Sequence, residues 1–164
     1  IEMLNEVVPR TKDDTNEILK IRSDFEDSIG MLYYHPNMDP DILEHYINKY
    51  KGVVIAGTAL GHVATSGEKS FIPILKKAKS KSIPIIMTTQ CYYGRVDPLV
   101  YSALRELSID CGVIFAEDML LETAYVKLGW ALKYTKNYDE LKELMQNNVA
   151  GEIKRPSHPN TFLN

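Results

Sequence analysis

The glycine-rich stretch from Gly57 to Ser70, GTALGHVATSGEKS, has the residue types of a phosphate-binding loop. A P-loop needs the spacing GxxxxGK[ST], in which backbone N–H groups curl around a phosphate and a lysine follows the second glycine directly. Here five residues separate Gly61 from Gly67, and Glu68 stands between Gly67 and Lys69. Because a carboxylate at that position would repel phosphate, and because GxGxxG is also absent, the stretch does not predict a nucleotide site.

His62 is the first candidate for a functional side chain, since it follows an apolar run that is typical of a buried strand. Its neighbours Thr58 and Gly61 are small enough to let a ligand approach closely, and an imidazole can hydrogen-bond a polar head group. A surface or turn histidine explains the same pattern, so both interpretations stay open.

A second polar cluster follows the run IPIIM. Thr88 and Thr89 carry hydroxyls, but a nucleophilic threonine needs an adjacent base and an oriented partner, so hydroxyls that bond the backbone are the favoured interpretation. Cys91 has no neighbouring His or Lys to activate it and is interpreted as a packing residue. Arg95 could grip a carboxylate, or serve solvation or a subunit contact. The acidic pair at 117–118 precedes a predicted helix, whose dipole it complements.

The composition limits the class of protein. The chain has 164 residues, 45% of them hydrophobic, and a formal net charge of −3, which together indicate one soluble globular domain without a dominant nucleic-acid-binding surface. Two cysteines favour a reducing, cytoplasmic location, and no His/Cys/Asp/Glu cluster has metal-ligand spacing. No segment resembles a membrane span or a signal peptide. Because the first residue is Ile1, we expect a piece of a longer protein.

The elements that would position these side chains alternate along the chain. Short β-branched or aromatic runs predict strands, and apolar residues at helical spacing predict helices. Pro73 fits only the first turn of its helix, Pro84 only the start of its strand, Asp39 is the predicted N-cap before Pro40, and Gly151 is the predicted C-cap of the last helix. The predicted strands are 30–36, 52–57, 83–90 and 112–118, and the predicted helices are 39–50, 70–81, 98–110, 121–135 and 138–151.

Strands that alternate with helices predict an α/β domain with a mainly parallel sheet covered on both faces. Ligands of such sheets lie beyond the carboxyl ends of the strands. The polar clusters at 35–37, 57–62, 88–95 and 116–119 all follow predicted strands. The sequence therefore predicts a site at one edge of the sheet.

Four stretches carry a resemblance to a known family: VVIAGTALGHV (53–63), IPIIMTTQCYYGRV (83–96), AEDMLLETAYVKLGWAL (116–132) and NNVAGEI (147–153). They resemble the C-terminal domain of the asparaginase/glutaminase family and, within it, the branch formed by the D subunits of archaeal glutamyl-tRNA(Gln) amidotransferases. The resemblance implies a Rossmann- or flavodoxin-like three-layer sandwich with about four strands. It also implies that residues 1–29 are a linker from an absent N-terminal catalytic domain, that 30–153 form the asparaginase-like domain, and that 154–164 are a loose tail.

The resemblance implies an amidohydrolase that releases ammonia from glutamine for the conversion of Glu-tRNA(Gln) to Gln-tRNA(Gln). The family's threonine nucleophile lies in motifs of the form TGGT and HGTD, which the present sequence lacks, so we expect the chain alone to be inactive. In asparaginase-like dimers the C-terminal domain lends residues to the neighbouring active site. His62 matches an asparagine with that role, Thr58 and Gly61 lie beside it, and Glu106 is the nearest match to a lent carboxylate.

The same resemblance implies a homodimer, the amidotransferase E subunit as partner and tRNA(Gln) bound through the complex, with no membrane. It implies no cofactor in this domain, and ATP and Mg at the partner subunit. Two alternatives remain: the C-terminal domain of a plain L-asparaginase, which the histidine at position 62 disfavours, and a non-catalytic nucleotide-sensing or subunit-docking α/β module.

Overall fold

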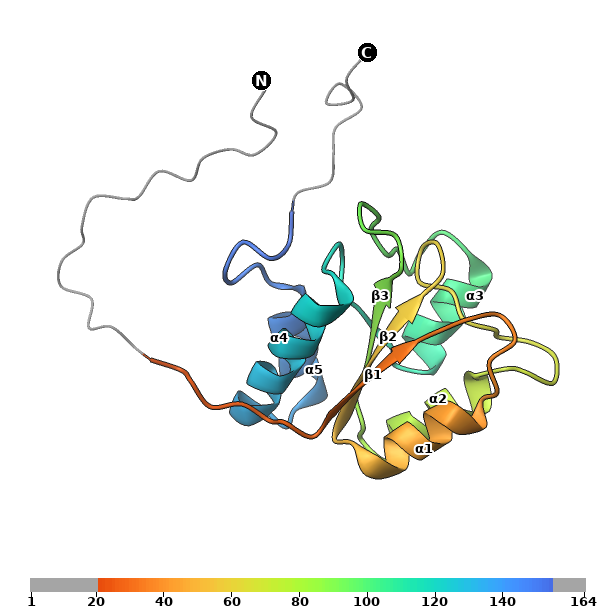
Figure 1. Cartoon of the computed structure of the whole chain (residues 1–164), viewed down its shortest axis with the longest axis horizontal. Coiled ribbons are helices and arrows are strands. Elements are labelled where there is room, and N and C mark those ends of the chain that lie inside the picture. The colour runs from red at the N-terminus through yellow and green to blue at the C-terminus, as the bar shows by residue number, and fades with distance from the viewer. Residues whose placement is uncertain (1–20, 155–164) are drawn as a thin grey trace, which may run out of the picture.

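The computed structural model describes residues 21–154 (Figure 1). The predicted tail from residue 155 onward and most of the predicted linker, residues 1–20, lie outside the described residues. The elements in chain order are β1 (Ile29–Tyr33), α1 (Asp41–Lys49), β2 (Gly52–Gly57), α2 (Ile72–Ser80), β3 (Ile85–Thr89), α3 (Ser102–Arg105), the π-helical segment η1 (Glu106–Asp110), β4 (Ile114–Phe115), α4 (Leu121–Tyr134) and α5 (Tyr138–Gln146).

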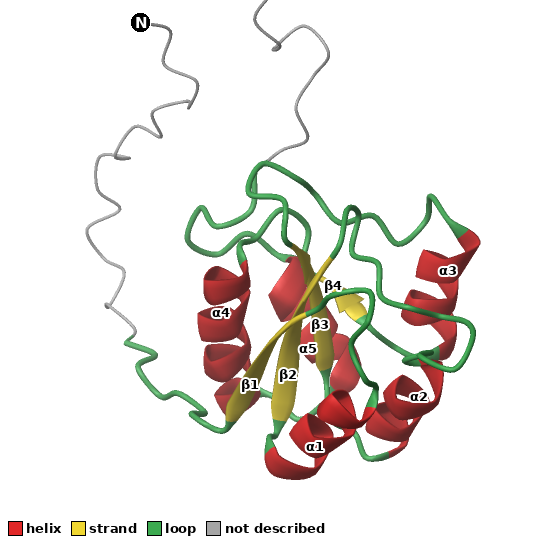
Figure 2. Ribbon diagram, turned by 45° about the vertical axis from the view of Figure 1, so that its right-hand side comes forward, coloured by secondary structure: helices red, strands yellow, loops and turns green. Residues whose placement is uncertain are grey.

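The strands form one parallel sheet in the order β1-β2-β3-β4. Every residue of β2 and β3 is buried, as the apolar run of β2 and the apolar start of β3 predict. Helices α1 to α3 and η1 cover one face, and α4 and α5 cover the other (Figure 2). The sequence-based prediction of an α/β three-layer sandwich with four parallel strands is confirmed.

Side chains of opposite orientation on the central strands divide the core into two clusters. Val53 and Ile55 of β2 pack with Leu75 of α2, and Val54 packs on the other face with Leu128 of α4. This alternation is the period-2 geometry of a strand, and it gives each helical layer its own apolar surface to bury.

Several predicted element boundaries differ from the structure; the fourth strand, for example, is only Ile114–Phe115. The last helix ends at Gln146, and Gly151 has a φ of +85° in a later turn, so the prediction of Gly151 as its C-cap is wrong. Pro40 rather than Asp39 is the residue before α1, although Asp39 still accepts a hydrogen bond from the backbone N–H of Asp41 at 3.1 Å. The third predicted helix begins only at Ser102, after the exposed segment 99–101.

The end of the predicted linker packs against the domain. The backbone N–H of Glu26 donates to the carbonyl of Gly129 in α4 at 2.9 Å, and the buried Glu26 carboxylate pairs with Lys51 at 2.8 Å. A Cβ at Gly129 would lie 2.2 Å from the Phe25 ring, so the glycine makes room for that ring. None of the helices found between residues 21 and 154 is long and apolar enough to cross a membrane.

Candidate substrate edge at the carboxyl ends of the strands

The loop after β2 is a tight turn that fixes the position of His62. Thr58 and His62 exchange two backbone hydrogen bonds of 3.0 and 2.8 Å, which close the turn through Ala59 and Gly61. Gly61 has a φ of +99°, and a Cβ there would lie 2.9 Å from Cγ of Met87. We expected the small size of Gly61 to let a ligand approach closely. Instead, it makes room for core side chains such as Met87, and Gly61 itself is buried.

His62 presents its ring at the edge of the molecule. The imidazole is partly exposed and lies against the ring of Tyr101, with 5.3 Å between centroids and 59° between the planes. Within residues 21–154 neither ring nitrogen has a hydrogen-bond partner, so the polar atoms of His62 are available to a group from outside. The Thr58 hydroxyl lies close by but donates to the His62 carbonyl at 3.4 Å.

The hydroxyls at the end of β3 bond backbone carbonyls. Thr88 is fully buried and donates to the carbonyl of Ile55 at 3.3 Å. Thr89 donates to the carbonyl of Ala59 at 2.5 Å and accepts from the backbone N–H of Cys91 at 3.1 Å. The interpretation that these threonines are structural is confirmed, and their role is to tie the end of β3 to the turn after β2.

Gln90 is a residue of this edge whose role was missed in the sequence. Its side-chain amide donates to the carbonyls of Tyr34 and Ala56, the latter at 2.9 Å, while its backbone N–H donates to Gly57 at 2.9 Å. One side chain thus ties together the carboxyl ends of β1, β2 and β3. The only signal in the sequence was a single amide side chain directly after a buried strand. This signal does not identify the residues that the amide contacts.

Cys91 differs from the sequence-based interpretation, whereas Arg95 follows one of the alternatives left open, the binding of a carboxylate. Cys91 is exposed, so its interpretation as a packing residue is wrong. Arg95 pairs with Glu117 and lies 3.4 Å from Oδ1 of Asp118, and it also donates to the carbonyl of Lys154. The arginine is therefore engaged by carboxylates of its own chain, and the acidic pair holds Arg95 instead of only complementing a helix dipole.

The acidic pair Glu117 and Asp118 also holds the segment that reaches Lys154. The backbone N–H of Lys154 donates to the Asp118 carboxylate at 3.1 Å, and the N–H of Val96 donates to the carbonyl of Glu117 at 2.9 Å. Glu117 adopts a φ of +59°, which non-glycine residues rarely adopt. Hydrogen bonds and ion pairs thus connect the loops after β3 and β4 with the segment that reaches Lys154.

Glu106 lies on a neighbouring element. It is partly buried at the first position of η1, and its carbonyl accepts from the backbone N–H of Cys111 at 3.1 Å. Wide helical turns of this kind are uncommon and often occur at functional sites. The structure brings His62, Thr58 and Gly61 together in one turn, and among the described residues no hydrogen bond or ion pair joins Glu106 to His62.

The sequence of this domain matches a known protein family. Residues 28–145 match the model of the glutaminase/asparaginase C-terminal domain, and the chain belongs to that family. The predicted membership of the family is thereby confirmed.

Individual relatives show to which branch of the family the chain is similar. The D subunit of glutamyl-tRNA(Gln) amidotransferase from Methanobrevibacter smithii is 44% identical over 155 residues, which cover 94% of this chain and 34% of that protein. The D subunit from Pyrococcus furiosus is 43% identical over 139 residues, which cover 84% of this chain and 31% of that protein. The chain thus spans about a third of the length of these relatives.

Solved structures agree on the fold. The thermostable L-asparaginase from Thermococcus kodakarensis superposes with a TM-score of 0.74 at 30% identity, covering 80% of this chain and 39% of that one. L-asparaginase I from Vibrio cholerae superposes with a TM-score of 0.73 at 24% identity, covering 85% and 42%.

Proposed function

We propose that this chain is the C-terminal part of the glutaminase subunit of a tRNA-dependent amidotransferase, which releases ammonia from glutamine for the conversion of Glu-tRNA(Gln) to Gln-tRNA(Gln). The observation that carries the proposal is the 44% identity to the D subunit of an amidotransferase over 94% of the chain. The matched relatives are about three times as long, which leaves room for a catalytic domain outside this sequence.

The two threonines at the end of β3 support a nucleophile located elsewhere. Acyl transfer needs a hydroxyl that a base can deprotonate and that a substrate carbonyl can reach. Thr88 is buried and bonded to Ile55, and Thr89 is bonded to Ala59. Neither hydroxyl meets these conditions, so we expect the isolated chain to release no ammonia.

His62 is the side chain best suited to complete an active site on a neighbouring protomer. Its backbone is fixed by the turn with Thr58, its ring is supported by Tyr101, and its nitrogens have no partner within the described residues. A neutral imidazole can donate one hydrogen bond and accept another, which suits the amide or carboxylate of a bound amino acid. This role assumes a homodimer formed by the asparaginase-like domain.

The remaining parts of the proposal concern the assembly. Ammonia would pass to the amidotransferase E subunit, the partner that would hold ATP and Mg and amidate the glutamate attached to tRNA(Gln). The net charge of −3 does not favour this chain as the main electrostatic contact for the tRNA.

The experiment is to measure ammonia release from glutamine and from asparagine by two proteins, this chain alone and a longer form that adds the upstream domain found in the relatives. We expect activity with glutamine only in the longer form. Activity in the isolated chain would overturn the assignment of the nucleophile, and a longer form that hydrolyses only asparagine would identify a plain L-asparaginase instead.

A further inference from the structure

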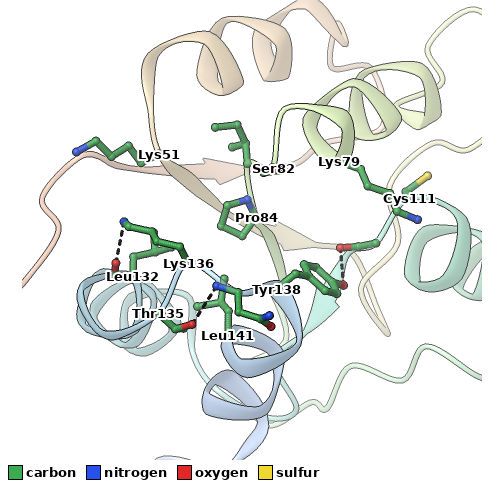
Figure 3. Close-up of a pocket in the computed structure, with 13 residues that line it drawn as sticks. Lys51, Lys79, Ser82, Pro84, Cys111, Leu132, Thr135, Lys136, Tyr138 and Leu141 are labelled. Atoms are coloured by element: carbon green, nitrogen blue, oxygen red, sulfur yellow. Dashed lines mark hydrogen bonds between the residues drawn. The ribbon is translucent and has the colours of Figure 1, made fainter.

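A cavity of about 620 Å³ lies at the opposite edge of the sheet, where the strands begin. Lys51 directly precedes β2, Pro84 directly precedes β3, and Gly112 lies shortly before β4. The connection between α4 and α5, including Lys136 and Tyr138, forms the opposing wall (Figure 3). The volume is within the range of small-molecule sites, and the length of the strands separates the cavity from the candidate substrate edge.

The inner wall of the cavity is apolar. Ile83 and Pro84 contribute the start of β3, Leu132 the end of α4, and Leu141 the first half of α5. Leu132 and Leu141 are buried, so the surface that they turn to the cavity is continuous with the core. An apolar group bound here would be removed from water, and the packed side chains would not have to move.

The rim of the cavity is positively charged. Among residues 21–154, three lysines line the cavity and no aspartate or glutamate does. Lys79 donates only to the backbone carbonyls of residues 109 and 110, at 3.3 and 2.9 Å, and Lys136 donates to the carbonyl of Leu132 at 3.0 Å. Among the described residues, these two ammonium groups have no carboxylate partner, whereas Lys51 is paired with Glu26.

The remaining titratable groups of the lining are neutral near pH 7. Burial, together with the nearby Asp139 carboxylate, raises the pKa of Tyr138, whose hydroxyl donates to the carbonyl of Gly112 at 2.9 Å. Burial also raises the pKa of the Cys111 thiol. Neither group therefore offsets the positive charge of the rim.

We propose that this cavity binds a small organic monocarboxylate, whose apolar body lies against Ile83, Pro84 and Leu141 and whose carboxylate meets the ammonium group of Lys136. Lys79 adds positive charge at the other end of the cavity (Figure 3). Lysine ammonium groups are strong hydrogen-bond donors to carboxylates. A phosphate would find few of the free backbone N–H groups at helix starts that many phosphate sites use.

Two of the N–H groups at the start of α5 are already occupied. The side chain of Asn137, at the start of α5, accepts from the N–H groups of Asp139 and Glu140 at 2.8 and 3.1 Å. The ligand would therefore depend on side-chain ammonium groups, which present one point charge each.

The experiment is a titration of the whole chain, labelled for nuclear magnetic resonance, with octanoate, 1-octanol and octyl phosphate as probes. We expect octanoate to shift the methyl signals of Ile83, Leu132 and Leu141 and to bind at least about tenfold more tightly than 1-octanol, because the alcohol lacks the charge. Equal binding of octanoate and 1-octanol, stronger binding of octyl phosphate, or shifts confined to other methyl groups would overturn the proposal.

Charge variants test the same assignment. Lys136→Gln should weaken octanoate binding about fivefold, and Lys142→Gln, which makes the same charge change on an exposed part of α5 outside the cavity, should leave it unchanged. An equal effect of both variants would show that general charge, and not this cavity, attracts the probe. The comparison of octanoate with 1-octanol uses the unaltered chain and holds even if a variant fails to fold.

Discussion

At the scale of single residues, the turn after β2 depends on the absence of side chains. Gly61 combines a φ of +99° with a Cβ direction that is blocked by Met87, Phe115 and Val96. Left-handed backbone is unfavourable for residues with a Cβ, and extra atoms in a packed core add a further cost. The position of His62 therefore depends on a glycine whose neighbours are core residues.

Gly61→Ala should lower the free energy of unfolding by about 2 kcal/mol and the Tm by roughly 5 °C, as measured by denaturant and thermal unfolding. The matched control is Ala59→Gly in the same turn, where φ is +45° and the residue is exposed. Glycine tolerates that backbone conformation, so this variant should keep the free energy of unfolding within about 0.5 kcal/mol of the parent or raise it. A Gly61→Ala variant as stable as the parent would contradict the packing argument.

At the scale of elements, a buried ion pair joins α4 to the segment after α5. Lys127 pairs with Glu152 at 2.5 Å, with side-chain exposures of only 6% and 12%. Glu152 also accepts from the backbone N–H groups of Val149 and Ala150. Burial raises the pKa of Glu152, but the hydrogen bonds from Lys127, Ala150 and Val149 outweigh it and lower that pKa to about 2.

Glu152→Gln should lower the free energy of unfolding by about 2 kcal/mol at pH 7, because it leaves the buried Lys127 without its carboxylate partner. A carboxylate whose pKa is depressed on folding contributes stability above its unfolded pKa of 4.5 and loses it as the pH falls towards about 2. The difference between parent and variant in urea unfolding should therefore fall by about half between pH 7 and pH 3.

The control for this variant is Glu143→Gln, which changes the same charge at an exposed position of α5. It should alter the free energy of unfolding by less than about 0.5 kcal/mol at every pH. A difference for Glu152→Gln that stays constant down to pH 3 would show that packing, and not the titration of this carboxylate, links the segment to α4.

The two ends of the sheet have different properties at the scale of the whole molecule. The carboxyl edge holds His62 in a rigid turn and ties Arg95 to Lys154, while the amino edge has an open, positively charged cavity. The proposed function uses the first edge and the proposed carboxylate site uses the second. The two proposals can therefore fail independently.

In the longer form of the protein, His62→Ala should reduce glutamine turnover about tenfold or more, because the substrate would lose a hydrogen bond from the neighbouring protomer. His45→Ala, on the exposed surface of α1, should leave turnover unchanged. Unchanged kinetics for His62→Ala would remove His62 from the site.

Mixing His62→Ala protomers with protomers that lack the upstream nucleophile distinguishes a lent residue from one acting in its own protomer. If His62 serves the neighbouring site, the mixture should recover about a quarter of the parent activity, since about half the dimers are mixed and each of these has one complete site out of two. No recovery would place His62 in the same site as its own protomer's nucleophile.

The sequence by itself determined the layer architecture and the edge of the sheet that carries the candidate residues. Hydrophobic period, chain order and proline positions are local properties, and they fix strand and helix types because each element must bury its apolar side. The placement of Thr58 and His62 beyond β2 followed from the strand alone. The family followed from contiguous motifs such as those around Gly57 and Thr88.

Only the tertiary structure decided which polar groups are already occupied. The partners in these contacts lie far apart in the chain, as Arg95 and Glu117 do, and also Gln90 and Tyr34. No local sequence pattern predicts such pairs. The cavity that includes Lys136 likewise arises where the starts of three strands meet the connection between α4 and α5. Whether a polar group already has a partner, and whether a cavity forms, depend on contacts between distant segments. The sequence could therefore identify these residues as candidates but could not identify their partners.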